Sequence, residues 1–253
     1  MFEGVGGVRI AGYVRKPAGV GPFPLVVLLH GGGPAARRVK AGSEAGQTDQ
    51  MTAEALRASQ ALGRGANPLV PAFIAQGWAV YSIDFRPNSR YPIDPVAFDD
   101  TLAALKKARS FSFVDPQRIA MLGGSHGGHV TGRMASRFEL ACAVLCAPAG
   151  LDLVLLSHLA QNGTPIGGNQ GLIRQMEQHE GVKMAEIEET PEAHHYSYLM
   201  TEAAKVQCPI LVISGRNDPN APLAAMGAYG DKLRALGTEA ETDPAAKAWF
   251  VRK

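Results

Sequence analysis

A serine in a glycine-rich turn is the residue of this sequence best suited to covalent chemistry. Ser125 stands in the turn GGSHG of residues 123–127, between an apolar run and a helical pattern. In a strand–turn–helix of this kind, the serine takes a strained backbone position that lifts its hydroxyl above the edge of a sheet. The amino end of the following helix favours developing negative charge. The pattern predicts a serine nucleophile for acyl transfer, and a helix-capping serine in a glycine turn is the alternative.

A second glycine-rich stretch, HGGGP, begins at His30 and ends an earlier apolar run. Hydrolases with a serine elbow hold the oxyanion with an N–H from such a loop and with the N–H of the residue after the nucleophile. The predicted donors are therefore Gly32, with its neighbours Gly31 and Gly33, and His126. A structural role in the loop suits the His30 ring better than that of a base. A phosphate-binding loop is discounted because no Lys-Ser/Thr follows the glycines.

An aspartate follows the last clear apolar run, in ISGRNDPNAP of residues 213–222. Asp218 comes after the serine in chain order, where a serine–acid–histidine triad on this type of sheet has its acid. Its predicted task is to hold an imidazole in the correct tautomer and to stabilise the imidazolium. A turn aspartate before a proline is the alternative interpretation.

Strand and helix patterns alternate along the chain and must position these loops. Continuous apolar runs predict strands that are covered on both faces, and helical patterns lie between them. The alternation predicts an α/β fold with a mostly parallel sheet, helices on both faces and ligands at the carboxyl ends of the strands. The expected strands are 8–14, 24–30, 78–84, 118–123, 140–146 and 209–214, and the expected helices are 68–76, 95–109, 126–137 and 222–236.

A single domain over residues 1–253 fits this order of elements. Two segments interrupt it. Residues 35–67 are polar, and residues 151–205 form a long excursion with a glycine-rich centre at 161–171. Both leave the carboxyl ends of strands, so they are predicted to form a lid over the site, with surface decoration as the alternative.

Composition limits the partners of the protein. Its 25 basic and 23 acidic side chains leave a formal charge of +2, which gives no electrostatic reason to expect nucleic acid or an anionic membrane. No apolar stretch approaches the roughly 18 residues that a membrane span needs. The first residues lack the pattern of a signal peptide. We therefore expect a cytoplasmic protein, although a chain whose leader had been removed would look the same.

The three cysteines give no sign of a metal or redox site. Cys142 and Cys146 lie in the apolar run 140–146, on one face of an expected buried strand, and Cys208 stands apart. We interpret them as small core side chains. An odd count provides no disulfide framework and is compatible with a reducing compartment. No cofactor and no metal are expected.

Four motifs together resemble a known family. HGGGP, IDFR at residues 83–86, GGSHGG and SGRNDPNAP, in this order, resemble the prolyl-oligopeptidase and acetyl-esterase-like branch of the α/β-hydrolases over about residues 8–236. The resemblance implies a Ser-Asp-His triad and hydrolysis of an ester or, less often, a peptide bond. Dienelactone hydrolases share the fold but have a cysteine nucleophile, whereas position 125 is serine.

On this basis we expect a serine carboxylesterase that acts on a small-molecule ester. A short acyl chain is favoured because the excursions have little continuous apolar lining. An oligopeptidase-like peptidase and a non-catalytic relative that kept the fold are the alternatives. The sequence is compatible with a homodimer.

The sequence departs from the family at the triad histidine, which usually follows the acid in a Pro-x-x-x-His-Gly motif. No histidine follows Asp218. Four explanations stay open: an altered or shortened end, a substitute histidine, a base from a partner subunit, or a non-catalytic relative. His194 and His195 could face the site from the excursion, although polar positions on a cap helix are the more ordinary interpretation. A triad role does not fit His126 or His129, at the start of the helix behind the serine.

Overall fold

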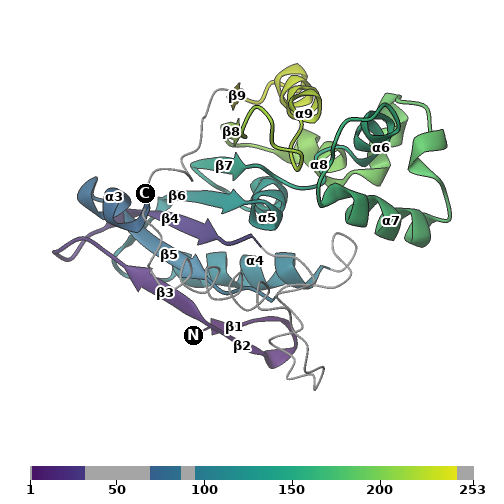
Figure 1. Ribbon diagram of the computed structural model, residues 1–253. Coiled ribbons are helices and arrows are strands. Elements are labelled where there is room, and N and C mark those ends of the chain that lie inside the picture. The colour runs from purple at the N-terminus through teal and green to yellow at the C-terminus, as the bar shows by residue number, and fades with distance from the viewer. Residues whose placement is uncertain (1, 32–68, 87–94, 244–253) are drawn as a thin grey trace, which may run out of the picture.

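The computed structural model describes residues 2–31, 69–86 and 95–243 (Figure 1). Within these residues a seven-stranded sheet carries helices on its faces, and a two-stranded ribbon precedes it. The first predicted lid segment, residues 35–67, lies outside the described residues.

The elements follow the predicted order closely. The strands are β1 (Phe2–Glu3), β2 (Arg9–Ile10), β3 (Gly12–Arg15), β4 (Phe23–Leu29), β5 (Ala79–Ile83), β6 (Val114–Gly124), β7 (Cys142–Cys146), β8 (Ile210–Ile213) and β9 (Ala240–Asp243). The α-helices are α3 (Leu69–Ala75), α4 (Val96–Arg109), α5 (His126–Ala135), α6 (Leu153–Gln161), α7 (Asn169–Glu180), α8 (Tyr198–Glu202) and α9 (Leu223–Ala235). Short 3-10 helices are η1 (Val5–Gly7), η3 (Met184–Glu186), η4 (Pro191–Tyr196) and η5 (Ala203–Lys205).

The order of strands in the sheet places the site. It is β3-β5-β4-β6-β7-β8-β9, with β3 antiparallel to β5 and the other neighbours parallel. The chain therefore leaves β4 toward β5 on one side and leaves β6 toward β7 on the other. Loops that diverge in this way at the carboxyl ends of parallel strands frame the place where α/β proteins bind ligands. Here they are the loop that begins at His30 and the turn at Ser125.

Core side chains lie on both faces of the central strands, as predicted. In β4, Val26 and Leu28 pack with Val70 of α3 on one face. The alternating residues Leu25 and Val27 belong to the larger core on the other face, which α4 and α5 cover. This alternation follows from the period of two in a strand, and it explains why the whole run is apolar.

The apolar runs of β7 and β8 are covered less completely than predicted. Ala143 and Leu145 are buried, whereas Cys142 and Cys146 on the opposite face are half-buried in the described structure. The two cysteines do share one face, as their spacing predicts. Burial raises the pKa of the Cys146 thiol to about 11, which leaves it a poor nucleophile at neutral pH.

The excursion of residues 151–205 is helical and packs beside the carboxyl ends of the strands. Figure 1 shows α6, α7 and α8 clustered beyond α5, on the side of the molecule away from α3. An ion pair fixes this cluster to the helix of the elbow, because Arg133 on α5 bonds the Glu202 carboxylate at 2.9 Å and both side chains are largely buried. Arg133 also stacks on Tyr198 and Phe98. Whether the excursion acts as a lid stays a prediction.

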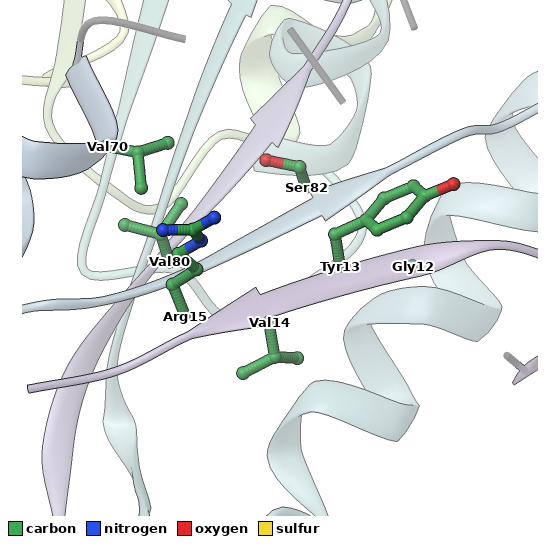
Figure 2. Close-up of a pocket in the computed structure, with 7 residues that line it drawn as sticks. All are labelled: Gly12, Tyr13, Val14, Arg15, Val70, Val80 and Ser82. Atoms are coloured by element: carbon green, nitrogen blue, oxygen red, sulfur yellow. The ribbon is translucent and has the colours of Figure 1, made fainter. Parts of the chain in front are cut away.

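A pocket of about 310 Å³ lies at the β3 edge of the sheet, away from Ser125. Figure 2 shows the Arg15 and Tyr13 side chains on the side of β3 that faces Val70, while Val14 points to the opposite side. Two strands, β5 and β4, separate β3 from the strand that carries the serine turn. The pocket is therefore no part of the candidate site.

Candidate active site

Ser125 occupies a strained turn between β6 and α5. Its backbone has φ 52° and ψ −117°, and the residue is exposed at the head of α5. Its N–H donates to the Cys146 carbonyl at 2.8 Å, and its own carbonyl accepts from the N–H of His129 at 3.1 Å. A positive φ is costly for a residue with a Cβ, so a chain keeps it where the surrounding structure holds it and a function needs it. This is the elbow geometry that the sequence predicts.

Three glycines near Ser125 leave little or no space for a side chain. A Cβ on Gly127 would lie 2.6 Å from the His30 carbonyl oxygen, and one on Gly123 would overlap the backbone of Gly127. A Cβ on Gly31 would stand 3.3 Å from the Ser125 Cβ. The loop after β4 therefore lies directly against the candidate nucleophile, where an oxyanion hole has to be.

The predicted oxyanion donors are only partly described. Gly32 and Gly33 lie outside the described residues, whereas His126 is the first residue of α5, so its N–H belongs to the open amino end of the helix. The His126 ring is buried edge-on against Phe85, with ring centres 5.5 Å apart. His126 can thus serve this site through its backbone and not through its imidazole.

His30 holds its own loop. Its Nδ1–H donates to the Gly31 carbonyl at 2.7 Å, and the ring stacks on Phe85 with centres 4.4 Å apart. Its Nε2 lies 3.6 Å from an Asp84 carboxylate oxygen. These contacts fit the structural role that was predicted for His30.

Asp218 lies in the loop after β8 with one carboxylate oxygen engaged. Its Oδ1 accepts from the backbone N–H of Asn220 at 2.8 Å and from the Asn220 side-chain amide at 3.2 Å. The residue is half-buried, and among the described residues its Oδ2 accepts no hydrogen bond. A carboxylate that is fixed at one oxygen and open at the other can orient an imidazole N–H.

The loop after β7, residues 147–150, joins the serine turn to the acid side of the sheet. Ala147 has a positive φ of 44°, and its N–H donates to the Ile213 carbonyl at 2.7 Å. The N–H of Ala149 donates to the Ser125 carbonyl at 3.3 Å. Nothing in the sequence pattern marked this loop, because alanine and proline carry no chemical signature.

Comparison with known proteins now identifies the family. Residues 73–246 match the prolyl oligopeptidase family. The chain belongs to the prolyl oligopeptidase family. This is a family of serine hydrolases with the α/β-hydrolase fold, so the resemblance seen in the sequence and the predicted fold are both confirmed.

Solved structures of the same fold include two peptidases and an esterase. The acylaminoacyl peptidase of Pyrococcus horikoshii has a TM-score of 0.61 and 16% identity, and the match covers 96% of this chain and 35% of that chain. A puromycin-hydrolyzing peptidase of Mycobacterium tuberculosis has a TM-score of 0.64, 20% identity and coverage of 95% and 34%. An esterase of Pyrococcus furiosus has a TM-score of 0.56, 16% identity and coverage of 96% and 77%. The chain thus spans about a third of the length of the two peptidases, and these likenesses concern the fold.

His158 and His195 of the excursion have partners away from the candidate site. His158 donates from Nε2 to the Ile187 carbonyl at 2.6 Å, and the exposed His195 donates from Nδ1 to the Glu192 carbonyl at 2.6 Å. Among the histidine side chains that the structure describes, which exclude that of His194, none hydrogen-bonds to Ser125 or to Asp218. The family's third triad member is therefore not in place among the described contacts.

Neither a metal centre nor a membrane span is found in the described part of the chain. No three His, Cys, Asp or Glu side chains gather there as metal ligands would. None of the helices described is both long and apolar enough to cross a bilayer.

His129 is a neutral imidazole that holds the loop after β7 beside Ser125. It is buried, and its Nδ1–H donates to the Ala149 carbonyl at 2.9 Å, beside the bond from Ala149 to Ser125. Burial lowers the pKa of His129 well below its usual 6.5, and the charge of Arg133 and the neighbouring His126 lower it further. The folded protein therefore resists protonation of this ring.

We expect this ring to make stability depend on pH. Because the unfolded chain protonates at its ordinary pKa and the folded chain does not, stability is full above that pKa and falls as the pH drops below it. Between about pH 7.5 and about pH 5.5, His129 alone should cost about 1.4 kcal/mol of the free energy of unfolding. Urea unfolding at both pH values should show this loss in wild type and in the exposed control His179→Gln, but not in His129→Gln. An equal pH dependence in both variants would contradict the assignment.

Proposed function

We propose that the protein is a serine hydrolase that cleaves carboxylic esters with short acyl chains. The conformation of Ser125 carries the proposal, because the residue is exposed at φ 52°, stands at the amino end of a ten-residue helix and has Gly31 against it. A hydroxyl placed in this way can attack a carbonyl that rests between it and the loop after β4.

In the proposed reaction, the Ser125 oxygen forms a bond to the carbonyl carbon while the π electrons move to the carbonyl oxygen. The N–H groups of His126 and Gly32, with Gly31 and Gly33 beside it, stabilise the resulting oxyanion. Collapse of this intermediate breaks the bond to the alcohol and leaves an acyl group on Ser125. Water then attacks the acyl group, and the acid is released. Asp218 orients an imidazole that takes the proton of the serine hydroxyl in the first half of the cycle and the proton of water in the second, and that returns it each time to the departing oxygen.

The rate of this reaction depends on the proton acceptor. A serine without a base is a poor nucleophile near neutral pH, and an oxyanion hole with binding alone gives about 10³–10⁴-fold over water. An imidazole that reaches the open Oδ2 of Asp218 would raise the rate by further orders of magnitude. The base would come from a histidine of a partner subunit or from another histidine of this chain, and alanine substitutions test the histidines one at a time.

Peptide hydrolysis is the second candidate, and the family match favours it because peptidases are among the similar structures. The leaving groups discriminate the two activities. A nitrophenolate departs without protonation, whereas an amine must be protonated by the catalytic imidazole as it leaves. Ester cleavage therefore depends less on a catalytic histidine than amide cleavage does. Faster turnover of an acyl-peptide anilide than of the matching ester would favour the peptidase.

Acyl-chain length tests the substrate class. We expect kcat/KM to be highest with p-nitrophenyl acetate or butyrate and at least about 10-fold lower with the dodecanoate, because a long chain needs an apolar lining. The excursion at residues 161–171 is instead polar and rich in glycine. Initial rates across the ester series, with the rate of Ser125→Ala subtracted, give the profile. A rate that climbs steadily from acetate to dodecanoate would refute the short-chain proposal.

A further inference from the structure

A buried asparagine at the start of α7 uses its whole side-chain amide. Asn169 has no exposed surface. Its Oδ1 accepts from the N–H of Gly150 at 2.9 Å, and its Nδ2 donates to the carbonyls of Ile166 and Asn220 at 2.9 and 2.8 Å. Because one partner is a donor and two are acceptors, the amide has a single orientation that satisfies all three. A buried amide bonded in this way is held rigidly.

The Nδ2 group of Asn169 is linked through Asn220 to the candidate triad acid. Asn220, whose carbonyl accepts from Asn169, donates both its backbone N–H and its side-chain amide to Asp218 Oδ1. The side-chain oxygen of Asn220 accepts a hydrogen bond at 2.9 Å from the N–H of Gly168, the residue before α7. Residues at the start of α7 therefore hydrogen-bond to Asn220 at its carbonyl and at its side chain. Asn220 in turn holds Oδ1 of Asp218.

The Oδ1 atom of Asn169 is linked through the loop after β7 to the candidate nucleophile. Gly150, which donates to Asn169, follows Ala149, whose N–H donates to the Ser125 carbonyl. Ala149 is held in turn by the Nδ1–H of His129. A continuous series of hydrogen bonds and single peptide links thus runs from Ser125 through Asn169 to Asp218, although Asn169 and Asn220 are 51 positions apart in the chain.

We propose that Asn169 is a positioning residue, which sets the Asp218 carboxylate at its distance from Ser125 by bonding the loop after β7 and the loop after β8 at once. The inference rests on the proposed function, because it assigns Asp218 the task of the triad acid. It makes the start of α7 part of the catalytic scaffold. A misplacement of about 1 Å in such a scaffold can cost about 100-fold in rate.

Two readouts test this role. Asn169→Ala removes all three bonds, and we expect kcat for p-nitrophenyl acetate to fall by about 100-fold while KM changes by less than about two-fold. Hydrogen–deuterium exchange should become faster at Gly150 and Asn220 but stay unchanged along β8. The matched control is Asn162→Ala, an exposed asparagine of the same excursion, which should leave kcat and exchange as in wild type.

The outcomes separate this inference from the proposed function. Unchanged exchange at Asn220 in Asn169→Ala, or a kcat equal to that of Asn162→Ala, would overturn the positioning role. If wild type shows no turnover, the proposed function fails, and exchange alone decides whether Asn169 couples the two loops. If Asn169→Ala does not fold, Asn169→Asp replaces it, because the carboxylate keeps an acceptor for the Gly150 N–H and loses the donor to the Asn220 carbonyl, with an expected loss of about 10-fold in kcat at unchanged KM. An Asn169→Asp protein with wild-type kcat would then overturn the inference.

Discussion

Replacement of Ser125 by alanine should abolish hydrolysis of p-nitrophenyl acetate and labelling by a fluorophosphonate probe, while the protein should stay folded. The first effect is expected because the Ser125 hydroxyl is the proposed attacking group, and alanine cannot form the acyl-enzyme. The second is expected because fluorophosphonates modify an activated serine. The fold should survive because the Ser125 side chain makes no hydrogen bond among the described residues, and alanine takes over the same backbone conformation.

Turnover by Ser125→Ala should fall to the rate of the ester in buffer alone. Far-ultraviolet circular dichroism and the urea midpoint, measured beside wild type, show whether the fold is kept. Ser110→Ala is a suitable control, because Ser110 is exposed at the end of α4 and its hydroxyl only donates to the Lys107 carbonyl. A Ser125→Ala protein that kept near-wild-type turnover would place the nucleophile elsewhere. Wild type that resists labelling would instead indicate a relative that kept the fold without the activity.

The elbow and the succession of strands and helices along the chain could be predicted because their signals are local. Gly123 is required by a clash within the turn, and Gly127 by a clash with the end of the neighbouring strand β4, yet both belong to one short motif that can be recognised in the sequence. The apolar runs of β4 and β5 report burial directly. Such signals need no knowledge of which distant segments meet.

The hydrogen-bonded connection between the serine and acid loops could not be predicted for the opposite reason. Asn169 stands in a polar stretch that reads as surface, and only closure of the excursion brings it to Gly150 and Asn220. The half-buried face of Cys142 and Cys146 was missed in a similar way. An apolar run indicates that a strand belongs to a sheet, but it does not indicate how much of each face of that strand is covered by other elements.

Gly127→Ala should destabilise the protein by about 3 kcal/mol, because overpacking against backbone cannot relax by rotation of a side chain. The new Cβ would stand 2.6 Å from the carbonyl oxygen of His30 and 2.7 Å from that of Leu29. Both oxygens belong to the end of β4 and the start of its loop. To make room, α5 would have to move away from β4, and Ser125 at the head of α5 would move away from Gly31. Loss of stability and loss of turnover should therefore appear together.

The same substitution elsewhere in the chain gives the matched control. Gly227 lies inside α9, its φ is not positive, and a Cβ there would meet no atom within 4 Å. Gly227→Ala should therefore raise the free energy of unfolding by about 1 kcal/mol through better helix propensity, with no change in activity. Urea unfolding at one pH should separate the two variants by about 4 kcal/mol, the sum of the two expected effects. If Gly127→Ala proved as stable as wild type, β4 and α5 would be free to separate at the elbow. The close contact between the loop after β4 and Ser125 could then not be what shapes the oxyanion site.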